Sequence, residues 1–598
     1  MLTGCLLAAS FPPSPLNFLI YIAFVPLFIL CELETVPGRV PEDKIFRPFK
    51  SFFVVAFRLL TFQFLWRPLR KGRAVFTYRR ATISGNAQLF RYTYAIFLVW
   101  NALCCYWLMM TAFGATDFGE ALIHATAGIL AIMLNPVLMV VPFQFLSRVR
   151  HVFHPVLASG CLVIFWLAFE YLHFNWDLSW SWLTLGHTMS AFPDYIQYAE
   201  FTGVLGISLH ILVGNLLIYQ FYRFKTHVGK FNLLRGSVMI GWFALPLLLN
   251  LFLLNPDRPV FQSTGQYTVR VVQPNVDPYK KYNYYTAEEQ VNLIAELIQS
   301  RPLDSIDLVI LPETAIPRPT ERNEMIHGRL LEPLWEIVDS FGVDILTGVE
   351  EYQIFRNKDS LPVSATPGYA YVAGARKAVY FDYYNAAVLL RGDRQLQSHR
   401  KGKLIPMVER TPFLEAISGF RAFKIDVGTG HGSYGLPDSI FPLESQDGLK
   451  IGAMICYESE YGDYVRAHPA KGAEMLAVLT NDGWWQQSSG YVQHAALSVL
   501  RALESRRELA RAANSGTSLF VDHLGRVSQS TAFGTTAVID QTLHRHTGTT
   551  FYTRHGDWIG RIALWLTLFA SIAAIVVNYR RKKPRTQPQD PNGAGTTA

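Results

Sequence analysis

Long apolar stretches constrain this chain more than any other feature of its sequence. Six of them are long enough to cross a bilayer as helices, for which about 20 mostly apolar residues suffice. They lie at residues 91–113, 119–147, 152–172, 200–222, 236–255 and 556–578. Two shorter apolar segments, 2–11 and 16–31, are separated by prolines that would break a helix and allow a tight hairpin. The sequence therefore predicts an α-helical membrane domain with about eight transmembrane helices.

The first segment is short for a complete span. We interpret it as a tilted or truncated helix rather than a cleaved signal peptide, because no basic leader precedes it and a second apolar segment follows at once.

Positive charge predicts the orientation of the spans, because Lys and Arg concentrate in short cytoplasmic loops. Residues 35–90 contain many basic residues and only Glu42 and Asp43 as acidic ones. Counted through eight crossings, this basic loop falls on the same side as three other basic clusters. These are Arg148 with Arg150, the loop with Arg223, Lys225 and Lys230, and the tail from Arg580 to Lys583. The net charge of +8 is thus explained by membrane orientation, and a nucleic-acid partner is not expected.

The topology divides the chain into four parts. Residues 1–255 form an N-terminal transmembrane domain with about seven spans, and residues 256–555 form one large extracytoplasmic domain. Residues 556–579 form a C-terminal transmembrane helix, and residues 580–598 a basic, disordered cytoplasmic tail. Inside the basic loop, residues 51–69 are expected to form either an interfacial helix or a cytoplasmic packing element.

Cysteine usage singles out one residue of the exported part. Five of the six cysteines lie in or beside the membrane segments, and Cys456 is the only one between residues 256 and 555. It follows the apolar run 451–455, which predicts a buried strand that ends at the cysteine. A lone thiol in an oxidising compartment is either buried and inert or retained for its reactivity. At this point both interpretations remain open, since free cysteine often behaves as a small hydrophobe.

The rest of the exported part alternates short β-like runs with helical stretches, which is typical of an α/β domain. A helix is expected at 286–300, a hairpin around residues 391–394, a long helix from Gln493 to Ala513 with a charged, solvated face, and a variable surface excursion at 352–382. Glu313 follows the strand 308–311, where a parallel sheet commonly opens onto a ligand site. Lys401 and Lys403 precede another short strand. Taken singly, each of these charged residues could equally lie on the surface.

The order Glu313, Lys401, Cys456 resembles the nitrilase superfamily, whose members carry a Glu-Lys-Cys triad on a four-layer αββα sandwich. Together with the membrane segments, the chain resembles the apolipoprotein N-acyltransferase family. Five motifs carry this resemblance: Leu311-Pro-Glu-Thr-Ala-Ile-Pro317, Lys401-Gly-Lys-Leu-Ile-Pro-Met-Val-Glu409, Cys456-Tyr-Glu458, Asn481-Asp-Gly-Trp484, and Arg501-Ala-Leu-Glu504 through Arg511-Ala-Ala-Asn-Ser-Gly516. The membrane loop Trp176–Gly186 is also similar. The sequence departs from the family at Tyr282, Met407 and Val408.

The resemblance implies roles for the matched residues. Cys456 is expected to act as nucleophile, Glu313 as general base and Lys401 as oxyanion stabiliser, with Lys403 as the rival to Lys401. Glu409, Tyr457 and Glu458 are expected to support this triad. A thiol needs a nearby base to become a nucleophile, and the oxyanion formed by its attack needs N–H donors. No cofactor or metal is expected, because the spacing of His and Cys in the exported part forms no compact ligand cluster.

The resemblance also implies the partners and the location. A phospholipid would donate an acyl chain to Cys456, and the thioester would then acylate the N-terminal amine of a diacylated apolipoprotein. The enzyme would be multi-pass in the bacterial inner membrane, with the catalytic domain in the periplasm and the C-terminus in the cytoplasm; no oligomer is implied. Two alternatives remain: a membrane-anchored nitrilase-type amidase that hydrolyses a small extracytoplasmic amide, and a transporter or lipoprotein-binding protein without catalysis.

Overall fold

A computed structural model describes residues 1–33, 86–115, 117–150, 152–228, 232–357, 361–372, 375–414 and 433–582 of the chain. Most of the basic loop 35–90, its expected helix at 51–69, and the tail after residue 582 lie outside the described residues.

The described part contains five helices that are long and apolar enough to cross a membrane, and a bent pair adds a sixth candidate. The helices of this region are α1 (Leu2–Ala9), α2 (Ile20–Ala23), α3 (Val25–Leu33), α6 (Asn86–Cys104), the 3-10 helix η2 (Tyr106–Gly114), α7 (Phe118–Met139), α8 (Val141–Val149), α9 (Pro155–His173), α10 (Ala199–Val228), α11 (Leu233–Leu253) and α20 (Trp558–Lys582). All six long apolar stretches of the sequence fall on these helices. The two N-terminal stretches form only short helices, so the number of crossings stays a prediction.

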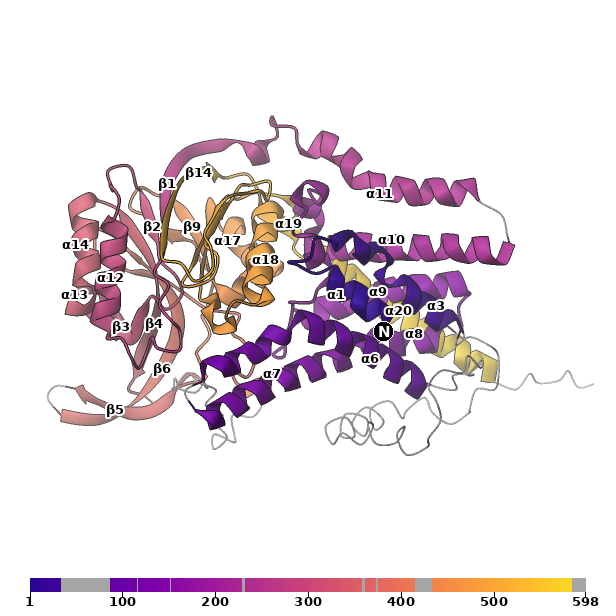
Figure 1. The fold of residues 1–598 in the computed structure, drawn as a ribbon, viewed down its shortest axis with the longest axis horizontal. Helices are drawn as coiled ribbons and strands as arrows, with labels where there is room; N and C mark the ends of the chain where they lie inside the picture. The colour runs from indigo at the N-terminus through magenta and orange to yellow at the C-terminus, as the bar shows by residue number, and fades with distance from the viewer. Residues whose placement is uncertain are drawn as a thin grey trace, which may run out of the picture.

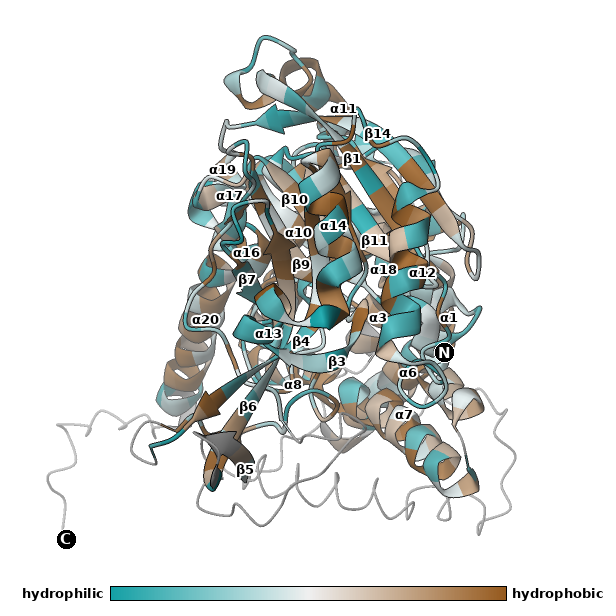
Figure 2. Ribbon diagram, turned by 90° about the vertical axis from the view of Figure 1, so that its left-hand side faces the viewer, coloured by the Kyte–Doolittle hydropathy of each residue, from teal (hydrophilic) through white to brown (hydrophobic). Residues whose placement is uncertain are grey.

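The apolar helices gather on one side of the molecule and the strands on the other, with α20 returning to lie among the N-terminal helices (Figure 1). The helix α20 is apolar over most of its length (Figure 2) and packs against α9. The C-terminal helix therefore joins the N-terminal ones in a single bundle, although some 300 residues separate them in the sequence.

Two sheets form the other half. The first has eight strands: β1 (Ser263–Gln273), β2 (Leu308–Ile310), β3 (Ile316–Glu321), β4 (Asp344–Phe355), β5 (Thr366–Val372), β6 (Ala375–Leu390), β7 (Gln397–Arg400) and β14 (Ala537–His546). The second has six: β8 (Leu443–Glu444), β9 (Lys450–Ile455), β10 (Met475–Thr480), β11 (Leu509–Ala513), β12 (Leu519–Val521) and β13 (Val527–Ser530). The central strands β9, β10 and β11 are parallel.

Apolar side chains of the two sheets pack on each other, including Ile310 and Leu389 of one sheet with Ile451 and Leu479 of the other. The outer face of the first sheet is covered by α12 (Ala287–Gln299) and α14 (Glu332–Phe341). The outer face of the second is covered by α18 (Ser489–Ser505). The four layers follow the order helix, sheet, sheet, helix (Figure 1), which confirms the αββα sandwich.

The expected helix from Gln493 to Ala513 is wrong in its second half. The helix α18 ends at Ser505, Arg506 takes a left-handed conformation with φ +53°, and β11 then pairs with β10. Alanine favours helices, but the alanines of β11 are completely buried between neighbouring layers, and this tertiary packing overrides propensity. The solvated face is also wrong. The charged side chains of the segment are buried, namely Arg501, Glu504, Arg506, Arg507, Glu508 and Arg511.

The segment expected as a surface excursion at residues 352–382 is built of paired strands, and its described residues from 361 to 377 stay mostly exposed or half-buried. The strand β4 continues to Phe355 and pairs with β6 along its whole length, while β5 pairs with β6 from the other side. Aromatic cross-strand contacts support this extension, since Tyr352 lies against Phe381 and Tyr383 with ring centroids 5.8 and 6.0 Å apart.

Candidate active site

Glu313, Lys401 and Cys456 follow the ends of three different strands. Glu313 lies in the turn after β2, Lys401 directly after β7 and Cys456 directly after β9. β2 and β7 belong to the first sheet and β9 to the second, so the two sheets together supply the three side chains. All three residues are at least 93% buried. None of the three strands is paired with another of the three.

The ammonium group of Lys401 bridges two carboxylates. Its Nζ donates to Glu313 Oε1 at 3.0 Å and to Glu409 Oε1 at 2.8 Å. Asn385 Nδ2 donates to the same two oxygens, at 2.7 and 3.2 Å. Burial alone would lower the pKa of Lys401, but the two carboxylates raise it well above its ordinary value. The site therefore holds a fixed cation between two anions.

Cys456 has an unusual backbone conformation for a residue with a side chain. Its φ is +48° and it opens the 3-10 helix η9 (Cys456–Glu460). Such a conformation costs of order 1–3 kcal/mol and persists only where the surroundings impose it. Burial and the nearby charge of Glu313 raise the pKa of the Cys456 thiol well above its usual range, while Lys401 acts to lower it. At rest the sulfur is thus a protonated thiol with a carboxylate and an ammonium group nearby.

Glu458 joins the lysine segment to the cysteine strand. Its carboxylate accepts from the backbone N–H of Gly402 at 2.6 Å and of Ile455 at 2.7 Å, and it contacts His399 Nε2 at 2.9 Å. Burial would raise the pKa of Glu458, but His399 and these hydrogen bonds lower it to about 2. An ionised carboxylate thus fixes Lys401 and Cys456 relative to each other. Glu409 holds the segment after Lys401 in place, since its Oε1 binds the Lys401 ammonium group and its Oε2 accepts from the backbone N–H of Ile405 at 2.9 Å.

A buried polar group behind Cys456 was not anticipated. His494 on α18 places Nε2 3.2 Å from the Cys456 carbonyl oxygen and Nδ1 2.8 Å from Asp482 Oδ1. Arg511 donates to Asp482 Oδ2 at 2.7 Å. Burial would raise the pKa of Asp482, but Arg511 and His494 lower it below its ordinary value. The arrangement holds the carbonyl of the strained residue, which identifies His494 as a positioning residue.

Lys281 and Asn385 were also missed. Lys281 is buried and its Nζ donates to Thr314 Oγ1 at 3.0 Å. Burial lowers its pKa to about 7, against the opposing effect of Glu313. The amide of Asn385, at the start of the apolar run 385–390, could have drawn attention to that residue, because a buried amide needs partners. No comparable local signal marks Lys281.

Comparison with known proteins matches both halves of the chain. A profile of the carbon-nitrogen hydrolase family matches residues 268–551, and one of the apolipoprotein N-acyltransferase N-terminal domain matches residues 45–217. The chain is 29% identical to the apolipoprotein N-acyltransferase of Chlorobaculum tepidum over 82% of this chain and 88% of that protein. The one from Geobacter metallireducens is 25% identical over 97% and 95% of the two chains.

The chain belongs to the apolipoprotein N-acyltransferase family. Among apolipoprotein N-acyltransferases, that of Thermotoga maritima is a further relative, 25% identical over 76% of this chain and 78% of its own. The hydrolase-type sandwich is thus accompanied by the N-terminal domain that this acyltransferase family carries.

In this acyltransferase, the sandwich contacts the membrane helices close to Cys456. Tyr457 donates its hydroxyl proton to Ser179 O at 2.8 Å, in the loop after α9, and Ser181 Oγ donates to Glu460 at 2.8 Å. Lys403 Nζ donates to Phe174 O at 3.1 Å. Tyr457 and Lys403 therefore point toward the membrane helices, whereas Lys401 points toward Glu313.

Tryptophans extend this contact to the positioning histidine. Trp107 and Trp182 both donate from Nε1 to Gln493 Oε1, at 3.1 and 2.8 Å. The ring of Trp182 also stacks on His494, with centroids 5.6 Å apart. Trp176 is different, since it remains 36% exposed. Two membrane-part tryptophans therefore touch the helix that holds the Cys456 carbonyl.

Proposed function

We propose that this protein transfers an acyl chain from a membrane phospholipid to the N-terminal amine of a diacylglyceryl-cysteine apolipoprotein, through a thioester on Cys456. One observation carries the proposal. A cysteine, a carboxylate and a lysine converge at the ends of three strands, and the cysteine segment directly contacts the loop that follows a membrane helix.

In the first half-reaction, Glu313 accepts the proton of the Cys456 thiol while the sulfur attacks the ester carbonyl carbon of the phospholipid. Only Oε1 of Glu313 is hydrogen-bonded in the described part of the chain, and 10% of its side chain stays accessible. Oε2 is therefore free to take the proton. The proton then passes to the departing glycerol oxygen as the C–O bond breaks, which releases a lysophospholipid and leaves the acyl thioester.

Lys401 stabilises the tetrahedral intermediate of this step. An ammonium group has three N–H donors, and two of them bind Glu313 and Glu409. Among the contacts that the structure describes, the third N–H has no acceptor, so it can donate to the oxyanion. Because packing and two carboxylates hold the lysine in place, it needs no reorganisation as the charge develops. Lys403 is committed to the Phe174 carbonyl, which favours Lys401 for this role.

In the second half-reaction, the amine of the apolipoprotein attacks the thioester carbonyl. Glu313 takes a proton from the attacking nitrogen and passes it to the departing Cys456 sulfur as the C–S bond breaks. The products are an amide on the apolipoprotein and the original enzyme. Atoms and charge balance without any further reactant.

Exposed apolar side chains near the site support lipid substrates. Met407, Val408 and Phe413 are each about half exposed, on the segment that follows Lys401. Trp176 of the membrane loop lies 6.5 Å from Phe413, centroid to centroid. Apolar groups at such a location suit acyl chains rather than a small polar amide. Hydrolysis of a small amide would also leave the extensive membrane part unexplained.

Eight crossings, with the sandwich in the periplasm of a bacterial inner membrane, complete the proposal. The helix α9 ends, and α10 and α20 begin, at the sandwich. Arg148, Arg150, Arg223, Lys225 and Arg580 lie toward the opposite helix ends. Basic residues favour the cytoplasmic side, which supports a periplasmic sandwich and a cytoplasmic C-terminus.

The decisive experiment incubates the purified full chain with phosphatidylethanolamine and measures the mass of the peptide that contains Cys456. We expect an added acyl group that hydroxylamine removes, release of lysophospholipid, and transfer to a diacylated lipopeptide on its addition. Cys456→Ala should show none of these. Free fatty acid without acylated lipopeptide would indicate a hydrolase, and absence of both acyl mass and acylated product would overturn the proposal.

A further inference from the structure

Three histidines surround one carboxylate on the sandwich, away from the candidate active site. Glu508 lies between α18 and β11, His523 follows β12, and His544 and His546 lie on β14. Measured to Glu508 Oε1, His523 Nδ1 lies at 3.6 Å, His544 Nδ1 at 3.2 Å and His546 Nε2 at 3.8 Å. One ligand atom each from Glu508, His523 and His546 lie within 4.8 Å of one another. Their positions in the sequence gave no indication of this cluster.

The spacing is that of ligands around a common ion. Two ligand atoms at about 2.0–2.1 Å from a tetrahedral zinc lie roughly 3.3 Å apart. The contacts of His523 and His546 with Glu508 are too long for hydrogen bonds. Within the described part of the chain, His523 Nδ1 and both ring nitrogens of His546 have no hydrogen-bond partner, and the His546 side chain is only 2% exposed. An imidazole buried in this way lacks the partners that buried polar groups normally have.

We propose that Glu508, His523 and His546 bind a divalent zinc-type cation. Imidazole and carboxylate ligands suit zinc, whose structural sites are closed and tetrahedral. His544 can supply the fourth ligand, since side chains two positions apart on a strand share one face. It is also the most exposed of the four, with 44% of its side chain accessible. The rival explanation is that the three histidines contact Glu508 directly, without a metal.

The location indicates a structural role. Cys456 follows the carboxyl end of β9, whereas Glu508 precedes the amino end of β11, which is parallel to it through β10. The metal site therefore lies at the opposite end of the parallel strands from the thiol. Its ligands come from both sheets, because β14 belongs to the first and β11 and β12 to the second. A bound ion would hold the sandwich together at this end.

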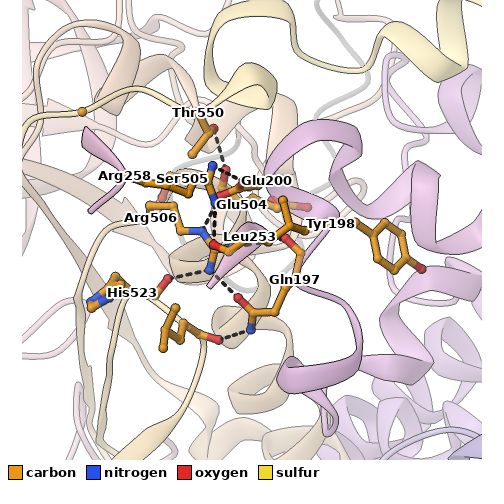
Figure 3. A network of polar contacts seen from close by, with 12 residues as sticks. Gln197, Tyr198, Glu200, Leu253, Arg258, Glu504, Ser505, Arg506, His523 and Thr550 are labelled. Atoms are coloured by element: carbon orange, nitrogen blue, oxygen red, sulfur yellow. Dashed lines mark hydrogen bonds and ion pairs between the residues drawn. The ribbon is translucent and has the colours of Figure 1, made fainter. Parts of the chain in front are cut away.

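The same ion would fix the turn that the segment just before the membrane helix α10 contacts. Arg506 Nη1 donates to the His523 carbonyl oxygen at 3.2 Å, and Gln197 Nε2 donates to Leu524 O at 2.9 Å. Figure 3 shows His523 at the border of this network, with its backbone turned toward Arg506. The site thus supports the junction between sandwich and bundle.

The test measures metal in the purified full-length protein in detergent. After dialysis against a weak chelator, elemental analysis should find a single equivalent of zinc, and competition with a chromophoric chelator gives its affinity. His546→Gln and His523→Gln should each weaken zinc binding by more than ~100-fold, because even indirect partners of metal ligands are worth roughly 10–100-fold. His327→Gln, at an exposed histidine, is the matched control and should bind zinc normally. Replacement by Co²⁺ should give the visible absorption of a tetrahedral site.

Thermal unfolding supplies a second measurement. Zinc should raise the unfolding temperature of the unsubstituted protein and of His327→Gln, but not that of His546→Gln. Failure of the unsubstituted chain to bind zinc or cobalt overturns the proposal, and so does unchanged affinity in both ligand variants. If a variant does not fold, the zinc competition and cobalt spectrum of the unsubstituted chain still decide. Acylation of Cys456 is scored separately, so loss of the metal site and loss of the proposed function are distinguishable.

Discussion

The carboxylates of Glu313 and Glu200 are both buried and both face a cation, but their pairing differs. Glu200 on α10 binds Arg258 through one oxygen and Arg506 Nε, at 2.6 Å, through the other. Arg506 also donates to the side chain of Gln197 at 2.6 Å, and this network spans the junction between bundle and sandwich (Figure 3). Glu313 uses only Oε1 in the described contacts.

The difference teaches how buried charge serves two purposes. When both carboxylate oxygens are bound, every polar group has a partner and the pair ties two segments together. When one carboxylate oxygen remains unbound beside a thiol and an ammonium group with a spare N–H, the carboxylate can take a proton and return it. The comparison predicts that substitutions at Glu313 and Lys401 change rates, whereas substitutions at Glu200 and Arg506 change stability.

The largest effect is expected for Lys401→Met. Loss of the cation removes the oxyanion donor, so formation of the Cys456 thioester should slow by about 10³-fold. Single-turnover acylation, followed by the mass of the Cys456 peptide, measures this rate. Lys403→Met is the matched control and should acylate within several-fold of the unsubstituted protein. A large loss in the Lys403 variant alone would exchange the two lysines' roles.

Arg506→Met should destabilise the protein, because it breaks the buried ion pair with Glu200. Removing one partner of a buried pair leaves a charge uncompensated, which typically costs ~3–5 kcal/mol; because Arg258 still pairs with Glu200, we expect about 3 kcal/mol. Thermal unfolding in detergent measures this loss, and acylation per folded molecule should be unchanged.

Arg526→Met is the control for this prediction. Arg526 pairs with Asp194 at 2.8 Å across the same junction, but both side chains are more than half exposed. The exposed pair should contribute no more than ~1 kcal/mol. Equal destabilisation by the two arginine variants would contradict the distinction between a buried and an exposed contact.

His494→Gln should have an intermediate effect on rate. With the Cys456 carbonyl less firmly held, the left-handed backbone can relax, and we expect acylation to slow by ~10-fold with little change in KM. The pH dependence of Cys456 alkylation should shift as well, which a loss of stability alone would not cause. His468→Gln is the control, because His468 is also buried but has no hydrogen bond to the cysteine segment in the described structure. An unchanged alkylation profile in His494→Gln would make that histidine purely structural.

Local sequence signals predicted the positions of Glu313 and Cys456 at strand ends, because an apolar run that stops at a polar residue is visible within a few residues. The αββα layers and the long apolar helices were predicted as well. The chemical roles of the triad stay predictions. Lys401 could not be separated from Lys403 by residue type, since the distinction depends on which side chain reaches Glu313 across the sheets.

Long-range packing explains most of what sequence could not predict. Arg501, Glu504 and Arg506 are typical of a solvated helix face, yet the membrane helices cover them. The alanines of β11 favour a helix locally, but two neighbouring layers enclose a strand there. Glu508, His523 and His546 come from three segments that only the sheet topology brings together.

The smallest effect is expected for Tyr457→Phe. Its hydroxyl binds the Ser179 carbonyl at 2.8 Å and not the triad, so its loss should cost about 1 kcal/mol of stability and leave acylation within roughly threefold. Tyr461→Phe is a close match, because that hydroxyl donates to Ser179 Oγ at 3.0 Å. If both tyrosines only hold the loop, the two variants should resemble each other in unfolding temperature and in rate. A far greater loss of rate in Tyr457→Phe alone would give this hydroxyl a part in the chemistry and place it with Glu313 and Lys401, whose substitution changes rates.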